Sequence, residues 1–226
     1  MLNRAARYFP ILRELRRHVA PGVRILDVGS GPIGIGEFWT YSFVGCDVSF
    51  PHSPRKPMQP VICSGSRLPF GDRSFDAVVV SDVMEHVPPD NRAELLVEVL
   101  RVTRKIAIFG YPCGPLALAL DKKLREDYQR HSLPVPTWLE EHMLYPFPQE
   151  NLFLELPSGW SMKVILNESL GFHYWMMRTE MFRLLDYMFR FGLSIMPRII
   201  EAVLRRMDRE PSYRKIFVLQ REVRWT

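Results

Sequence analysis

Cysteine is scarce in this chain of 226 residues, which contains only Cys46, Cys63 and Cys113 and no C-x-x-C pair. The scarcity argues against a disulfide framework and a cysteine zinc site, and it is typical of a reducing compartment. No uninterrupted apolar segment reaches the roughly 18 to 20 residues that span a bilayer. The N-terminal residues are charged throughout and lack the apolar stretch of a secretory signal. We therefore expect a cytoplasmic protein.

The sequence also lacks repeats and low-complexity tracts. Its apolar fraction of 47% and charged fraction of 24% are those of a folded protein. At this length we expect a single domain over residues 1–226 with a large core. The net charge of +5 leaves room for an acidic partner, either nucleic acid or an anionic membrane, but modest basicity is usually a solvated surface.

A glycine turn follows the first predicted strand. Residues 23–28 are apolar and β-branched, as in a buried strand, and the run ends in Asp27-Val28-Gly29-Ser30-Gly31. Glycine lets the backbone turn tightly and approach a ligand, since it has no Cβ. A parallel strand, a glycine turn and the start of a helix together predict a nucleotide-sized pocket at the carboxyl edge of a sheet.

The glycines alone do not identify which nucleotide binds in this pocket. Gly29, Gly31 and Gly34 satisfy the G-x-G-x-x-G pattern of dinucleotide-binding dehydrogenases. Asp27 argues against that alternative, because a carboxylate there would repel a pyrophosphate and suits a ligand that carries an ammonium group. Asp47, at the end of the next predicted strand, would bind a ribose in either fold.

Five short segments, in this order, resemble the class I S-adenosylmethionine (AdoMet) methyltransferases, above all the branch that includes ubiquinone and menaquinone biosynthesis methyltransferases. They are Asp27-x-Gly29-x-Gly31, Gly45-x-Asp47, Leu68-Pro-Phe70, Ser74-Phe-Asp76 and Glu85-His-Val87. The resemblance covers about residues 20–110. It implies an AdoMet-dependent enzyme with a Rossmann-like α/β fold, in which a seven-stranded, mostly parallel sheet has an antiparallel last strand and helical insertions.

The resemblance also implies which residues bind the cofactor. In the family, the acidic strand end and the glycine turn hold the methionine part of AdoMet, and the second acid holds the ribose hydroxyls. Ser64 departs from the pattern, since many members carry an aspartate there that binds the adenine amino group. The predicted cofactor residues are Asp27, Gly29, Ser30, Gly31, Asp47, Val48, Ser64, Gly65 and Ser81.

The acceptor of the methyl group is expected at the end of the next central strand. Residues 81–86 follow the apolar run 77–80 and should lie at the same sheet edge. His86 is the candidate base for a hydroxyl acceptor, because imidazole titrates near neutral pH; alternatively, Glu85 and His86 only shape the pocket wall. The predicted acceptor pocket consists of Asp82, Glu85, Tyr111 and His142, and no metal is predicted.

Two segments of helical character, residues 115–147 and 172–207, are predicted as insertions that cap the acceptor pocket. In the first, Thr137 and Glu140 fit a capping box. The second is rich in methionine, aromatic residues and arginine. Thioethers line adaptable surfaces, so an acceptor lid, a membrane-resting element and a helical hairpin packed on the sheet all stay open.

The remaining elements follow from periodicity. Pro10 argues against one straight helix over residues 2–20, because an interior proline removes a hydrogen bond. Further helices are predicted at 35–41, 91–103, 116–130 and 149–156, and further strands at 43–47, 61–63, 105–109, 161–166 and 213–220.

The sequence thus predicts a methyltransferase acting on a small-molecule, lipid-linked or saccharide acceptor, with oxygen favoured as the methylated atom. The basic, amphipathic stretches leave open a peripheral contact with a membrane. One alternative is a membrane-associated or scaffolding protein that keeps the fold without turnover. Another is an RNA or protein methyltransferase; only charge suggests it, and no nucleic-acid partner is expected.

Overall fold

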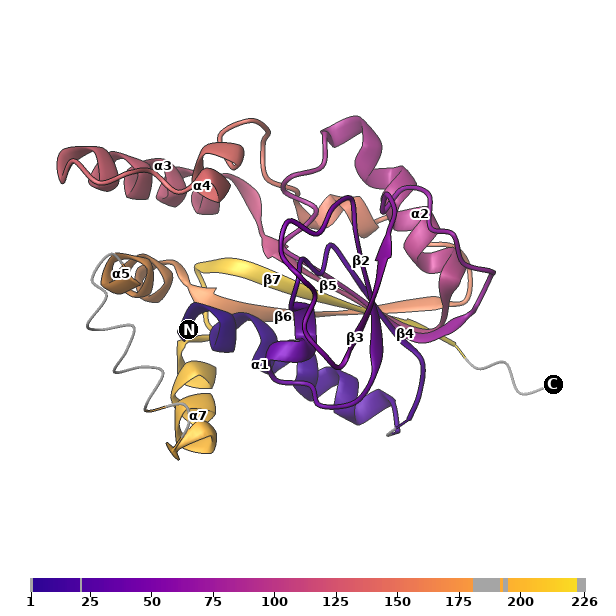
Figure 1. Cartoon of the computed structure of the whole chain (residues 1–226). Helices are drawn as coiled ribbons and strands as arrows, with labels where there is room; N and C mark the ends of the chain where they lie inside the picture. Colours follow the sequence, from indigo (N-terminus) through magenta and orange to yellow (C-terminus); the bar gives the residue numbers. More distant parts are fainter. Residues whose placement is uncertain (1, 21, 181–191, 193–194, 223–226) are drawn as a thin grey trace.

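The computed structural model describes residues 2–20, 22–180, 192 and 195–222. One seven-stranded sheet of order β3-β2-β1-β4-β5-β7-β6 forms its centre (Figure 1). The strands are β1 Ile25–Val28, β2 Phe43–Asp47, β3 Met58–Ile62, β4 Phe75–Ser81, β5 Thr103–Pro112, β6 Trp160–Ser169 and β7 Ser212–Arg221. Strands β1 to β5 pair in parallel, whereas β7 runs antiparallel to β5 and β6. The Rossmann-like sheet expected from the sequence is confirmed.

Helices lie on both faces of this sheet, with α2 on one face and α1 on the other (Figure 1). The α-helices are α1 Leu2–His18, α2 Arg92–Val102, α3 Gly114–Arg130, α4 Thr137–Glu141, α5 Leu170–Glu180 and α7 Pro197–Met207, and the 3-10 helices are η1 Gly34–Glu37, η2 Pro89–Asn91 and η3 Glu150–Phe153. Among the described residues, none of the helices has the length and apolar character needed to cross a membrane.

The central strands bury both faces. Successive side chains of a strand point to opposite faces, and β4 therefore divides its residues between two cores. Val78 and Val80 pack with α2, whereas Ala77 and Val79 pack with α1. Strands β5 and β7 alternate in the same way. This two-sided burial explains why β4 is a continuous apolar run in the sequence.

A third apolar cluster joins the two predicted insertions. It contains Leu124 of α3, Leu139 of α4, Met176 of α5 and Leu204 of α7, together with Leu2 and neighbouring residues at the start of α1. Figure 1 shows α3, α4 and α5 together at one end of the sheet, beyond the carboxyl ends of the parallel strands. The described parts of residues 115–147 and 172–207 therefore pack against each other and against the first turns of α1.

Several local predictions were wrong. The chain forms a single helix through Pro10, because α1 buries Ile11, Leu12 and Leu15 on the sheet and this packing outweighs one lost hydrogen bond. Residues 35–41 form only the 3-10 helix η1, since Gly34 and Gly36 are poor helix formers.

Prolines explain the next two differences. Residues 149–156 form only η3, because the chain lies between Pro148 and Pro157 and the residue before a proline avoids helical angles. Strand β3 begins at Met58 and includes Pro60, which an edge strand tolerates because its free side needs no N–H donor.

The predicted capping box is absent, because Pro136 is the N-cap of α4 and no side chain caps the helix. Of the segment 172–207, α5 and α7 are helical as expected. The methionine- and phenylalanine-rich residues 181–191 lie outside the described part of the chain.

Candidate functional site

The tip of β1 places a buried carboxylate under a glycine turn. Asp27 is 1% exposed, and its Oδ2 accepts a hydrogen bond of 2.8 Å from the Ile35 backbone N–H. Burial raises the pKa of Asp27 to about 7, despite this hydrogen bond and with a further contribution from Asp47. At Gly34, with φ of +51°, an added Cβ would lie 2.1 Å from Asp27 Oδ2. Only glycine allows the chain to pass so close to that carboxylate.

The neighbouring strand supplies a second carboxylate. Asp47 ends β2, and its Oδ2 accepts a 2.9 Å hydrogen bond from the Gly31 N–H. The turn itself is held by the Cys46 carbonyl, which accepts from the N–H groups of Gly29 and Ser30. Gly29 and Gly31 both have positive φ, and nothing lies within 4 Å of a Cβ built on Gly31. Hydrogen bonds to Cys46 and Asp47 of β2 therefore hold the turn, whereas the space beside the Gly31 Cα is open.

Beyond Asp47, the strand ends present apolar side chains to solvent. Val48 is 70% exposed and Ile62 is 71% exposed. The Ser64 and Ser66 hydroxyls are 3.0 Å apart, and Gly65 packs tightly against Leu95. Exposed aliphatic groups beside a carboxylate that can bind a ribose suit the flat face of a base. Ile62 was missing from the sequence prediction, although its place at a strand end is a usable signal.

Asp82, which follows β4, lies between two arginines. Arg214 of β7 binds it with two parallel hydrogen bonds of 3.0 Å, and Arg7 Nη2 of α1 lies 2.6 Å from Oδ2. Burial alone would raise the pKa of Asp82, but the two guanidinium groups hold it below its usual range. The carboxylate predicted to touch the acceptor thus ties α1 and β7 to the end of β4.

The chain of polar contacts continues from Arg214 across β6 and β7. Arg214 Nη1 donates to Glu168, whose other oxygen lies 2.6 Å from His173 Nδ1. The His173 ring stacks on Tyr213 with ring centroids 3.4 Å apart. Tyr213 in turn donates a 2.9 Å hydrogen bond to Asp121 of α3. No sequence pattern indicated these partners, since they lie on elements far apart in the chain.

The end of this network meets the predicted acceptor residues. Asp121 Oδ2 lies 2.7 Å from His142 Nδ1, and His142 Nε2 lies 3.9 Å from Glu85 Oε1. The His86 and His142 ring centroids are 5.0 Å apart. The structure therefore brings Glu85, His86 and His142 together, as the predicted acceptor pocket requires.

Glu85 and His86 have contrasting surroundings. Glu85 is 1% exposed, and within the described part of the chain neither of its carboxylate oxygens has a hydrogen-bond partner. Burial and the charge of Asp82 raise the pKa of Glu85 well above its usual value. His86 is partly exposed, with Nδ1 at 3.2 Å from Glu141 Oε2, and burial together with His142 lowers its pKa.

Two other predicted residues lie away from open space. Tyr111 is fully buried, and its ring stacks on Phe217 in the core on the α2 side of the sheet. Ser81 is 5% exposed, and its hydroxyl has no hydrogen-bond partner among the described residues.

Arg7 and Tyr8, which the sequence did not single out, reach the site from α1. Burial and Asp27 raise the pKa of Tyr8 above its usual value.

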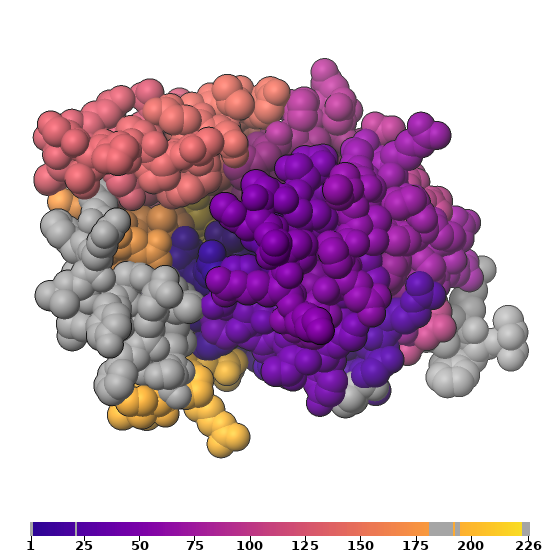
Figure 2. Space-filling model, in the orientation of Figure 1, coloured from indigo at the N-terminus to yellow at the C-terminus, as the bar shows by residue number. Residues whose placement is uncertain are grey.

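A hollow opens on the face seen in Figure 2. Its visible walls are the salmon atoms of α3 and α4 and the purple atoms of the β2–β3 region, and indigo atoms of the N-terminal segment lie at its floor.

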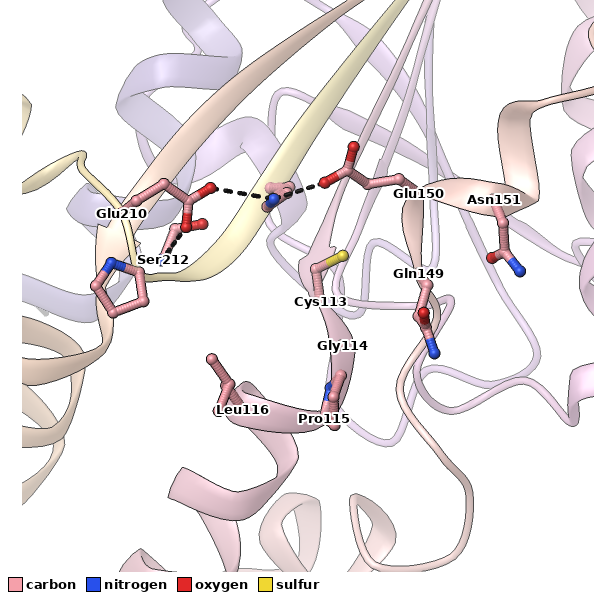
Figure 3. Close-up of a pocket in the computed structure, with 11 residues that line it drawn as sticks. Cys113, Gly114, Pro115, Leu116, Gln149, Glu150, Asn151, Glu210 and Ser212 are labelled. Carbon is pink, nitrogen blue, oxygen red and sulfur yellow. Dashed lines mark hydrogen bonds and ion pairs between the residues drawn. The ribbon is translucent and has the colours of Figure 1, made fainter.

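A cavity of about 370 Å³ lies where β5 ends and β7 begins. Cys113, Leu116, Glu150 and Glu210 line this cavity (Figure 3), and no predicted cofactor or acceptor residue does.

Comparison with known proteins shows what kind of domain this is. Residues 26–109, which contain both carboxylates, the glycine turn and the Glu85-His86 pair, match the family model described as a methyltransferase domain. This stretch, a little over a third of the chain, is similar to a methyltransferase domain. No curated protein sequence matches the chain.

Two solved structures with TM-scores above 0.5 share the fold of the chain, and a third aligns over a shorter stretch. Magnesium protoporphyrin IX methyltransferase from Synechocystis PCC 6803, crystallised with bound SAH, is 12% identical with a TM-score of 0.52, over 95% of this chain and 81% of that one. The cyclase SpnF is 14% identical with a TM-score of 0.54, over 95% and 81%. Protein PH0226 from Pyrococcus horikoshii OT3 is 22% identical with a TM-score of 0.47, over 57% of this chain and 61% of that one.

Together, the sheet order and the solved structures confirm the Rossmann-like, class I methyltransferase fold expected from the sequence. The chain spans about six tenths of the length of the Pyrococcus protein. Because identities this low establish the fold alone, the acceptor has to be argued from the side chains of this chain.

The close approach at Gly34 can be tested by substitution. We expect Gly34→Ala to lower the free energy of unfolding by about 1 to 3 kcal/mol, because of the left-handed backbone and the Cβ contact with Asp27 Oδ2. Gly71→Ala is the control, since nothing lies within 4 Å of its Cβ. Equal urea midpoints for the two variants would show that the turn does not need glycine.

Proposed function

We propose that the chain binds AdoMet at the tips of β1 and β2 and transfers its methyl group to a small-molecule acceptor, at oxygen. The observation that supports this most strongly is the pair of carboxylates, Asp27 and Asp47, which hold one glycine turn from two adjacent strands. Lipid-linked and saccharide acceptors belong to the same proposal.

The residues at the strand tips fit the cofactor. The open space above Gly31 admits a ligand against the backbone, and the charge of Asp27 complements an ammonium group beside it. Asp47, which receives one N–H from the turn, is placed to accept from ribose hydroxyls. Val48 and Ile62 offer apolar contact to adenine, and Ser64 and Gly65 form the adjoining backbone.

The acceptor would enter from the side of α3 and α4. Methyl transfer to oxygen is an in-line displacement, for which the protein supplies alignment and a proton acceptor. His86 is the candidate base, because Glu141 orients its Nδ1 and leaves Nε2 available. Glu85 and His142 form the neighbouring wall. Asp82 positions α1 through Arg7 instead of contacting the acceptor.

Cofactor binding should depend on the charge of Asp27. AdoMet carries an ammonium group, so the ionised carboxylate is the form that binds. With a pKa of about 7 in the free protein, Asp27 is mostly protonated at pH 6 and mostly ionised at pH 8. We expect the dissociation constant for AdoMet, measured by calorimetry, to rise about tenfold from pH 8 to pH 6.

Two variants separate this effect from general acid sensitivity. Asp27→Asn should bind AdoMet weakly at both pH values, and the exposed Asp90→Asn should keep the wild-type profile. If the wild-type protein binds AdoMet equally well at pH 6 and pH 8, Asp27 is not the ammonium ligand. Absence of AdoMet binding at every pH would defeat the proposed function itself.

Turnover tests the role of His86. With labelled AdoMet and pools of hydroxylated small molecules, lipid-linked intermediates and saccharides, the wild-type protein should label one acceptor class. We expect His86→Gln to reduce turnover by about 10²- to 10⁴-fold with AdoMet affinity unchanged, as for loss of a general base. His131→Gln, at the exposed end of α3, is the control. Full activity of His86→Gln would leave alignment alone as the source of catalysis.

Peripheral membrane contact is a second candidate, and α7 favours it. Ile199 and Val203 lie four residues apart on this helix, and each is about half exposed, as is Ile195 just before its start. Exposed arginines flank them at 198, 205 and 206. An apolar stripe beside basic residues is the pattern of a helix that rests on anionic lipid.

Vesicle flotation checks the membrane candidate. We expect binding to vesicles that contain phosphatidylglycerol but not to pure phosphatidylcholine, with release at high salt. Reversing Arg205 and Arg206 to Glu should weaken binding more than tenfold, because each basic residue near the surface contributes about 1 kcal/mol. Leu116→Glu, at an exposed position of α3, is the control and should bind the vesicles like the wild-type protein. Equal flotation with both vesicle types, or with neither, would remove this candidate.

A further inference from the structure

We propose that Glu85, His86 and His142 form a binding site for a divalent transition-metal ion, which neither the sequence motifs nor the family match assigns. One ring nitrogen of each histidine and one oxygen of Glu85 all lie within 4.8 Å of one another. Two imidazoles and one carboxylate are a ligand set that first-row transition metals accept, with positions left open for another ligand.

The first argument is the unpaired carboxylate of Glu85. The side chain is buried, and no residue that the structure describes donates a hydrogen bond to either oxygen. Arg92 lies close enough to influence it, but Nε and Nη2 of Arg92 bond to the carbonyls of Met84, Val87 and Pro146. A buried carboxylate without a donor costs several kcal/mol, and a bound cation would remove that cost.

The second argument is the orientation of the histidines. A carboxylate lies at Nδ1 of each ring: Asp121 is 2.7 Å from His142 in a hydrogen bond, and Glu141 is 3.2 Å from His86 in an ion-pair contact. Because an ionised carboxylate only accepts, the Asp121 contact favours the His142 tautomer with the proton on Nδ1 and the lone pair on Nε2, and Glu141 would favour the same tautomer of His86. Histidines that ligate metals are held by outer carboxylates in just this way. Asp121 is itself fixed by the Tyr213 hydroxyl.

Binding would require a small contraction of the cluster. Metal–nitrogen bonds of about 2.0 Å place tetrahedral ligand atoms about 3.3 Å apart, and His142 Nε2 already lies 3.9 Å from Glu85 Oε1. His142 is held in place by Asp121 and by the Phe147 ring, whereas the partly exposed His86 is free to move inward.

The consequence for catalysis rests on the proposed function. An acceptor hydroxyl in an open coordination position would lose its proton more readily, because a bound cation lowers the pKa of a coordinated oxygen. In that state the His86 ring binds the metal instead of accepting the proton. The two roles of His86 are therefore exclusive: the acceptor hydroxyl would be activated by coordination and would release its proton to solvent water, and the resulting oxygen would take the methyl group.

The test is direct binding of Zn²⁺ and Co²⁺ to chelator-treated full-length protein. We expect one Zn²⁺ per chain by calorimetry, a raised thermal unfolding midpoint, and visible absorption on Co²⁺ addition that reports nitrogen and oxygen coordination. Glu85→Gln and His86→Ala should each weaken Zn²⁺ binding by about a hundredfold or more and abolish the Co²⁺ bands. Asp121→Asn, acting through His142, should weaken binding about 10- to 100-fold.

The controls make the result decisive. His52→Ala removes one exposed histidine outside the cluster and should bind Zn²⁺ like the wild-type protein. Circular dichroism shows whether each variant is folded; if Glu85→Gln is not, His86→Ala carries the comparison. A wild-type protein without stoichiometric Zn²⁺, or with Zn²⁺ binding unaffected by both variants, would overturn the site. Zn²⁺ binding without AdoMet binding would defeat the proposed function and leave the metal site standing.

Discussion

The Asp82 carboxylate joins three parts of the chain that are far apart in sequence. Arg7 comes from the first helix, Asp82 from the end of the central strand and Arg214 from the last strand. A buried carboxylate costs several kcal/mol of desolvation, which is offset only when its partners hold it with good geometry. Two parallel hydrogen bonds from Arg214 and an ion pair from Arg7 meet that condition. These contacts hold helix α1 at the carboxyl edge of the sheet, where the helix forms the floor of the hollow in front of β4.

The proposed cofactor half and the proposed acceptor half of the site are built in different ways. Asp27, the glycine turn and Asp47 lie within a short stretch of chain, on adjacent parallel strands. Their hydrogen bonds follow from the order of strand, turn and strand. The acceptor half depends on contacts such as that of Tyr213 with Asp121, whose partners are 92 positions apart. A family model that ends at residue 109 includes the first kind of contact but cannot include the second.

This difference explains how much of the protein could be predicted. The sheet and its antiparallel strand followed from apolar runs, and the residues around the glycine turn followed from motifs with fixed spacing. The 3-10 helices η1 and η3 were missed because glycine and proline shortened helices that periodicity alone extended. The partners of Asp82 and His142 could not be found, since nothing local in the sequence specifies a pairing between distant elements.

The same network gives the hollow two ends of different charge. At the end near α1, two guanidinium groups are matched by Asp82 and Glu168, so the buried charges there balance. At the end near α4, the carboxylates of Glu85, Asp121 and Glu141 surround two imidazoles, while Arg92 is occupied by backbone carbonyls. An anionic acceptor group would be repelled from the second end, whereas a hydroxyl or a cation would be stabilised there. Under the proposed function, the charge of the acceptor would be selected by the segment that carries Asp121, Glu141 and His142, whereas the matched residues 26–109 would supply the cofactor site.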